Sequence, residues 1–144
     1  MIQAQIVNND IQVWQTWFPK RGDVYYCNLD GIDSEQQGIR PVVILSNNKG
    51  NFYGSIVVVA PITSKKKHLP QIHVSVGKEI GLKIDSYVLT EHIRTISKRR
   101  FFINGNYPTK ITTFSKYKMI EIEDAIKCEL GFTNWICRNV YIVK

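Results

Sequence analysis

The chain has 144 residues and a formal net charge of +7, with 44% hydrophobic and 22% charged residues. These values are typical of one globular domain with its own core and exclude an intrinsically disordered chain. No run of about 18 apolar residues is present, which argues against a transmembrane helix. The first residues lack the basic head and apolar core of a signal peptide. We therefore expect a single cytoplasmic domain over residues 1–144, without a membrane partner.

The cysteine and histidine residues do not form a recognisable metal site. The three cysteines include no CxxC pair, and the three histidines lack the spacing of paired ligands. We expect reduced, structural thiols, no bound metal and no other cofactor. The residues concerned are Cys27, Cys128, Cys137, His68, His73 and His92.

Positive charge is concentrated outside the expected C-terminal helix. Four of the 12 acidic residues fall between Met119 and Leu130, a segment with one basic residue, Lys127. The rest of the chain has 18 basic and 8 acidic residues, a net charge of +10. A basic body favours a polyanionic partner, either nucleic acid or an acidic protein segment.

The chain begins with an expected N-terminal arm, residues 1–19. Ile11, Trp14, Trp17 and Phe18 have helix-like spacing, and Pro19 then ends any helix. We expect a short amphipathic helix that docks on the body. Stacking of RNA bases on its aromatic rings is the alternative. The core is expected over residues 20–131, with an extension over 132–144.

Several short strands are expected in the first half of the core. After a turn at 20–23, residues 24–29, 40–46 and 55–62 are rich in β-branched and aromatic residues. A polar loop over 30–39 and a turn cluster over 47–51 separate them. Pro61 lies near the end of the third strand, which indicates an edge, a bulge or a break in pairing.

More strands and one helix are expected after the basic loop at 65–70. Strand patterns cover 72–76, 85–91 and 92–96, with an extension into 98–103, and a turn follows at 104–106. The helix after them is expected to begin at the N-cap Ser115 and to end at Gly131. Its core-facing stripe is Met119, Ile122, Ile126 and Leu130. Residues 135–143 resemble one more strand. This order predicts a small, strongly curved, barrel-like sheet with a C-terminal helix.

Arg40 stands where the polar loop joins the second strand. Pro41 favours an extended backbone at Arg40 and provides no amide donor. A cation at the start of a strand, beneath amide and carboxylate side chains, could bind a phosphate. The alternative is a surface ion pair with Glu35.

Other polar groups cluster at the ends of expected strands. Thr63 and Ser64 end the third strand, and Glu91 lies near the end of a later one. In a small barrel these residues could meet Arg40 at one mouth. Cation, hydroxyl and carboxylate together suit phosphodiester cleavage by the 2′-OH of RNA, which needs no metal. Alternatively, Thr63 bonds its own turn and Glu91 pairs with Arg94.

Four motifs in order carry a resemblance to a known family. They are the R-G-D-V-Y run at 21–25, E-Q-Q-G-I-R-P-V-V-I at 35–44, A-P-I-T-S at 60–64 with Leu-Pro at 69–70, and D-S-Y-V-L-T-E-H-I-R-T-I at 85–96. From about residue 20 to about residue 100 the chain resembles the MazF/PemK family of toxin endoribonucleases.

The resemblance implies an SH3-like barrel of the CcdB/MazF type, usually a homodimer. It implies metal-independent cleavage of single-stranded RNA to 2′,3′-cyclic phosphate and 5′-hydroxyl ends. It implies inhibition by an antitoxin with a disordered acidic segment. Arg40, Thr63 and Glu91 match residues that act in catalysis, Glu91 only in some members. The loops implied to bind RNA contain Ser34, Glu35, Gln36, Gln37, Ser64, Lys65, Lys66 and Lys67.

Two other functions remain as alternatives. A CcdB-like topoisomerase poison would need a C-terminal Trp-Gly-Ile ending, whereas Trp135-Ile136 lacks the glycine and the chain continues to Lys144. A catalytically silent module would bind RNA or antitoxin through its positive charge but would not cleave RNA.

Overall fold

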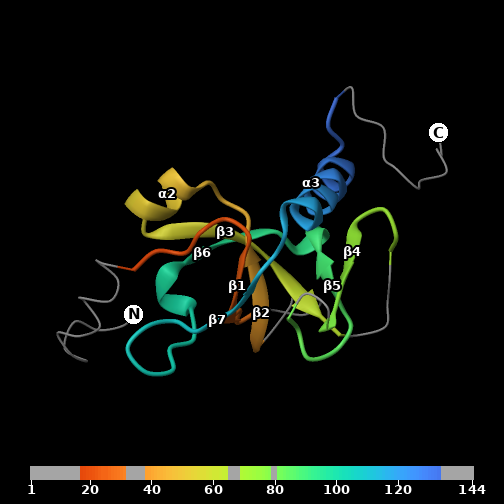
Figure 1. The fold of residues 1–144 in the computed structure, drawn as a ribbon. Coiled ribbons are helices and arrows are strands. Elements are labelled where there is room, and N and C mark those ends of the chain that lie inside the picture. The colour runs from red at the N-terminus through yellow and green to blue at the C-terminus, as the bar shows by residue number, and fades with distance from the viewer. Residues whose placement is uncertain (1–16, 32–37, 65–68, 79–80, 134–144) are drawn as a thin grey trace.

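The computed structural model describes residues 17–31, 38–64, 69–78 and 81–133. The expected N-terminal helix and the expected strand at 135–143 lie outside these ranges, apart from Trp17 and Phe18. Seven strands and one long helix dominate the described part (Figure 1). The elements, with η for 3-10 helices, are β1 Asp23–Asn28, β2 Ile39–Ile44, α2 Asn48–Tyr53, β3 Ile56–Thr63, β4 His73–Val76, β5 Ser86–Leu89, η3 Thr90–His92, β6 Arg94–Ser97, η4 Lys98–Arg100, β7 Lys110–Thr113 and α3 Lys116–Leu130.

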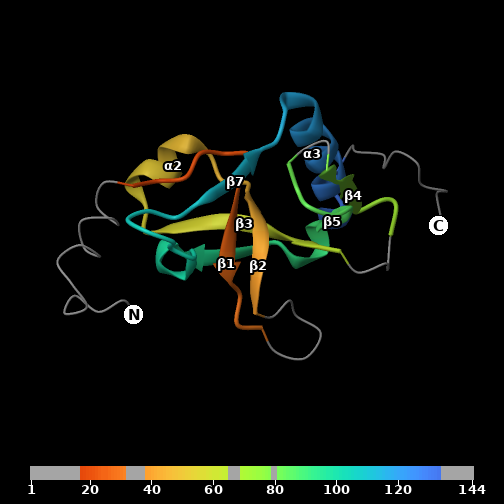
Figure 2. The same cartoon turned by 60° about the horizontal axis from the view of Figure 1, so that its bottom comes forward.

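Strand β3 is the centre of the sheet because it has different partners along its length. The strand order is β4-β5-β3-β2-β1-β7, and β6 also pairs with β3. Pairing with β2 reaches Val42–Pro61, and pairing with β5 begins at Ile62–Val88. Strand β2 lies on one edge of β3, while on the other edge β6 pairs up to Val59 and β5 follows from Ile62, so Pro61, which has no amide to donate, lies where both edges change. The expected break in pairing at Pro61 is confirmed, and Figure 2 shows β3 crossing from the side of α2 to the side of α3.

The sheet curls back on itself next to β1. After η4, Phe101 forms a bridge with Cys27, and the amide of Phe102 donates to the carbonyl of Tyr26 at 2.9 Å. One apolar core fills the resulting barrel, with Val42, Ile44, Val59 and Ile96 among its buried members. Trp17 packs on this core, edge-on to Tyr25 and Phe101 at 5.4 and 5.3 Å between ring centroids. The expected docking of the arm is confirmed for this residue.

A second core lies between the other side of the sheet and α3. Ser115 caps α3 by accepting from the Lys118 amide at 3.1 Å, and Gly131 ends it with φ 64°, both as the sequence predicts. Met119 and Ile122 are buried in this core and Ile126 is partly buried. Leu130, however, is 61% exposed, so the predicted stripe is wrong at its last position. Leu130 is the last residue of the helix, next to the exposed Gly131.

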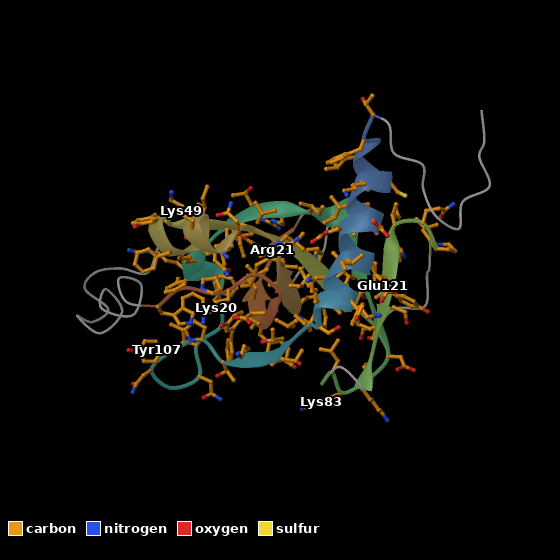
Figure 3. The ribbon with its side chains drawn as sticks, turned by 45° about the horizontal axis from the view of Figure 1, so that its top comes forward. Lys20, Arg21, Lys49, Lys83, Tyr107 and Glu121 are labelled. Atoms are coloured by element: carbon orange, nitrogen blue, oxygen red, sulfur yellow. The ribbon has the colours of Figure 1, made fainter. Side chains whose placement is uncertain are left out.

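The acidic side chains of α3 are largely engaged in the fold. Arg21 lies between the sheet and α3 (Figure 3), where its Nη2 contacts the Glu123 carboxylate at 2.9 Å. Lys118 pairs with Glu121 at 2.9 Å. Helix α3 begins at Lys116, so it includes Lys116 and Lys118 in addition to the acidic segment from Met119 to Leu130. The whole helix is therefore less acidic than the segment from Met119 to Leu130 alone.

Four local predictions are wrong. The strands expected over 85–91 and 92–96 are interrupted at Thr90–His92, which form η3. Residues 48–53 form the helix α2 instead of a turn, because the Asn47 side chain caps it by accepting from the Gly50 amide at 2.7 Å. Residues 98–100 form η4 instead of extending a strand, with Ser97 accepting from the Arg99 amide. Strand β7, which pairs with β1, was not predicted at all.

The cysteines also differ from expectation. Cys27 is free and buried, whereas Cys128 in α3 is disulfide-bonded, so the prediction of reduced thiols is wrong for Cys128. Among the described helices, none has the length and apolar character needed to cross a membrane.

Asp23 joins the first turn, β1 and β7. Its carboxylate accepts from the Lys20 amide at 3.1 Å, the Tyr25 hydroxyl at 3.2 Å and the Thr113 hydroxyl at 2.8 Å. Burial, followed by the Asp23 charge, raises the pKa of Tyr25, so its hydroxyl remains a donor. One buried carboxylate thus satisfies three donors from separate segments.

Asp23→Ala should lower the free energy of unfolding by about 2–3 kcal/mol, because buried donors lose their acceptor. Ser115→Ala, which removes one helix cap, should cost only about 1 kcal/mol. Urea unfolding followed by circular dichroism measures both. A loss below about 0.5 kcal/mol for Asp23→Ala would contradict this role.

Candidate active site

Four strand ends meet at one mouth of the barrel. Strands β1 and β3 end there, while β2 and β5 begin there, because each neighbouring pair is antiparallel. The β2–β3 register runs from Ile44–Val59 to Val42–Pro61. Two residues beyond that last pair, on the same face of each strand, come Arg40 and Thr63. The sheet therefore brings these two predicted catalytic residues to the same end.

Arg40 lies on the boundary between the mouth and an outer pocket. It is half-buried in β2 and pairs across the sheet with Cys27 of β1. It also lines a pocket of about 390 Å³, together with Ser64, Ser86 and Lys83. Lys83 lies at the edge of the molecule, below β4 and β5 (Figure 3). The pocket combines cations and hydroxyl groups with an apolar wall that includes Ile62 and Ile84.

Thr63 and Ser64 differ in accessibility. Thr63 is only 5% exposed and pairs with Tyr87 of β5, and it does not line the pocket. Ser64 is exposed and lines the pocket beside Arg40. Alternation along β3 explains the difference, because successive side chains point to opposite faces. The two hydroxyl groups therefore approach Arg40 from opposite faces of the sheet.

Glu91 lies apart from these groups. It comes four residues after Tyr87, on a segment that runs back along β3, so its backbone is roughly 10 Å from Thr63. Its Oε2 contacts His73 Nε2 at 2.7 Å and His92 Nε2 at 4.0 Å. The expected alternative, an ion pair with Arg94, is not formed. The other oxygen, Oε1, is buried without a hydrogen-bond donor among the described residues.

The His73 ring is held from both sides. Its Nδ1 accepts from the Leu69 amide at 2.9 Å, so in the neutral ring Nε2 carries the proton and donates to Glu91. Leu69 directly follows the basic segment 65–68 in the chain. Glu91 therefore orients His73, and His73 in turn holds Leu69 beside the basic segment 65–68.

Seven of the eight predicted RNA-binding residues lie outside the described residues, namely Ser34, Glu35, Gln36, Gln37, Lys65, Lys66 and Lys67. Only Ser64 can be placed, in the pocket with Arg40. Sequence reasoning did not assign Lys83 or Ser86 to the site, although Ser86 belongs to the D-S motif at 85–86 and Lys83 lies two residues before it.

Known proteins with similar sequences identify the family of this chain. A family model described as PemK-like, MazF-like toxin of type II toxin-antitoxin system matches residues 20–130. The chain belongs to this family. Endoribonuclease MazF of Staphylococcus epidermidis is 42% identical over 120 residues, covering 81% of this chain and 94% of that protein. Endoribonuclease MazF of Staphylococcus saprophyticus is 43% identical over 116 residues, covering 78% and 91%.

Solved MazF-type structures share the fold. An endoribonuclease in complex with its cognate antitoxin, from a mycobacterial species, has a TM-score of 0.64 at 27% identity, covering 80% of this chain and 97% of that chain. MazF from Deinococcus radiodurans has a TM-score of 0.67 at 22% identity, covering 81% and 99%, which concerns the fold alone. The predicted CcdB/MazF-type fold is confirmed. The chain is thus a type II toxin of the MazF endoribonuclease class.

In this MazF-family chain, Cys27 lies beside Arg40 but is unsuited to chemistry. Burial raises the pKa of its thiol to about 12, although the positive charges of Arg100 and Arg94 oppose the shift. The thiolate, which is the reactive form, is therefore nearly absent from the folded protein at neutral pH.

Cys27 should resist alkylation by iodoacetamide at pH 8.5 in the folded protein and react readily in urea, where its pKa returns to about 8.5. Because the folded state holds the proton up to about pH 12, its stability should fall as pH rises above about 9. Mass spectrometry of the Cys27 peptide measures the modification. Rapid alkylation without denaturant would contradict the buried, protonated thiol.

Proposed function

We propose that this chain cleaves single-stranded RNA, including mRNA, at short sequences by metal-independent transesterification. The observation that carries the proposal is the convergence of Arg40 and Thr63 from β2 and β3 on one barrel mouth, with Ser64 beside them. The family and its endoribonuclease relatives supply the reaction class.

The chemistry requires only groups of this kind. The 2′-oxygen attacks the adjacent phosphorus and loses its proton, while the bond from phosphorus to the 5′-oxygen breaks and that oxygen takes up a proton. The products are a 2′,3′-cyclic phosphate and a 5′-hydroxyl, and water can carry the proton between the two oxygens. The guanidinium of Arg40 stabilises the charge on the phosphorane oxygens, since an arginine is too basic to accept a proton at neutral pH.

The hydroxyl groups position the phosphate. Thr63 donates from the face of the mouth, and Ser64 donates from the pocket side. The segments that contain residues 34–37 and 65–67 contact base edges and backbone, respectively, because amides read bases and lysines bind phosphates.

The proposed partners are RNA, an antitoxin and a second copy of the chain. The net charge of +10 outside the core segment of α3 attracts polyanions. An acidic, disordered antitoxin segment would compete with RNA for this charge. A homodimer and a cytoplasmic location are carried over from the family resemblance.

Glu91 acts through His73 in this proposal. Its carboxylate is bonded to His73 and its backbone is distant from Thr63, so we place it outside the reacting atoms. Its role is to hold Leu69, and with it the end of the basic segment, by way of the His73 ring.

Arg40→Ala should lower the rate of RNA cleavage in EDTA by at least about 100-fold, because it removes the charge stabilisation of the transition state. Lys49→Ala, an exposed change on α2, should leave the rate unchanged. Products from a long mixed-sequence RNA are mapped by their 5′-hydroxyl ends, with circular dichroism as the folding control. Cleavage that disappears with EDTA would exclude the mechanism, and tight binding without any cleavage would favour a silent module.

Glu91→Gln should retain cleavage within about threefold, since the amide oxygen can still accept from His73 Nε2. Glu91→Ala and His73→Ala should both weaken RNA binding and raise KM while changing kcat less, because the loop anchor is lost. Single-turnover rates across a range of RNA concentrations separate the two constants. If Glu91→Gln lost as much kcat as Arg40→Ala, Glu91 would instead belong to the proton-transfer machinery.

A further inference from the structure

Two more guanidinium groups reach the same mouth of the barrel. Arg94, at the start of β6, donates from Nη1 to the Leu29 carbonyl at 2.6 Å. Arg100, in η4, donates from Nη1 to the carbonyls of Asn28 and Leu29 at 3.2 and 3.4 Å. Both side chains are half-buried and bind backbone carbonyls at the end of β1, just before the polar loop.

The sheet register places Arg94 on the same face as Arg40. Arg94 pairs with Val59, which on its other side pairs with Ile44, and Arg40 precedes Ile44 by four residues. On a strand, residues separated by four positions point to one face. The Leu29 amide also donates to the Gly38 carbonyl at 3.0 Å, which holds the start of β2 against the end of β1.

Arg94 and Arg100 have no carboxylate partner within 4.0 Å among the described residues. The ion pairs of the described part involve Arg21, His73, His92 and Lys118 instead. Asp30, which follows Leu29, is exposed and forms no ion pair with either arginine. Among the described residues, the hydrogen bonds of these two positive charges go to neutral carbonyl oxygens at the end of β1, the strand whose Cys27 pairs with Arg40. Both charges also act on Cys27, because each of them lowers the pKa of its thiol and so opposes the effect of burial.

Capping the end of β1 does not require these charges. A neutral amide donor could bond a carbonyl oxygen equally well, and close like charges repel one another. Each guanidinium has five N–H donors, and the bonds described here come from Nη1 alone. The remaining donors are suited to an anion that enters the mouth, because the planar guanidinium matches phosphate oxygens.

We propose that Arg94 and Arg100 form a second phosphate-binding site, which holds the RNA phosphate next to the one that Arg40 stabilises. This inference rests on the proposed function, because RNA supplies the row of phosphates. The site fixes the register of the strand on the barrel mouth, and its charge adds to affinity without touching the reacting atoms.

The salt dependence of RNA binding tests this site. A mixed-sequence RNA with 2′-O-methyl groups throughout cannot be cleaved, because it lacks the attacking hydroxyl, so its Kd can be measured from 50 to 300 mM salt. For single strands, the slope of log K against log salt changes by about 0.7 for each phosphate contact. Arg94→Gln and Arg100→Gln, which retain an amide donor for the β1 carbonyls, should each reduce the slope by about that amount and weaken binding roughly fivefold near 100 mM salt.

Two matched variants separate phosphate binding from local structure and from bulk charge. Arg94→Lys keeps the charge and N–H donors, so it should retain the wild-type slope. Arg99→Gln removes the same charge from the exposed neighbour in η4 and should change the slope much less. Thermal unfolding verifies that each variant is folded. If Arg94→Gln does not fold, Arg100→Gln provides the test, since its hydrogen bonds are longer.

The outcomes distinguish this site from the catalytic proposal. Wild-type cleavage of unmodified RNA together with unchanged slopes in both glutamine variants would overturn the second phosphate site alone. Equal effects of Arg94→Gln and Arg99→Gln would also overturn it, because bulk charge would then suffice. If the glutamine variants reduced the slope but the wild-type protein cleaved no RNA, the result would support the site and contradict the catalytic proposal.

Discussion

The antiparallel register between β2 and β3 is the constraint on which the candidate site depends. Val42–Pro61 is its last pair, and Arg40 and Thr63 follow two residues later on each strand. A slip of one residue would move one of these side chains to the other face and separate the pair. Two buried cores oppose such a slip, since the residues of β2 and β3 alternate between the barrel interior and the layer under α3. The positions of Arg40 and Thr63 are thus set by apolar packing.

Proline at position 61 links this register to the rest of the fold. At Pro61, which has no amide to donate, the pairing of β3 with β2 ends on one edge. On the other edge the partner of β3 changes from β6 to β5, which leads onward to His73 and Glu91. Beyond this point Ile62 and Ser64 of the β3 segment line the pocket beside Arg40.

Much of this architecture could be predicted from the sequence, and the exceptions have physical causes. The strands with continuous β-branched runs and the capped helix α3 were predictable, because their local signals agree with their packing. Helix α2 was not, since Asn48, Gly50 and Asn51 favour turns and only the Asn47 cap favours the helix. The four residues of β7 have no apolar run, and they form a strand only because β1 offers them an edge. Arg94 and Arg100 reach carbonyls 65 to 72 residues away, so no local pattern reveals their place at the mouth.

The central claim is that Arg40 and Thr63 act on one scissile phosphate. A double-mutant cycle on single-turnover cleavage tests it most directly, with Arg40→Ala, Thr63→Val and the combination compared on one RNA in EDTA. Residues that act as a unit are strongly non-additive, so the double variant should be little slower than the slower single variant. If the two losses instead multiplied, Arg40 and Thr63 would act independently, and the account of a shared phosphate at the barrel mouth would be wrong.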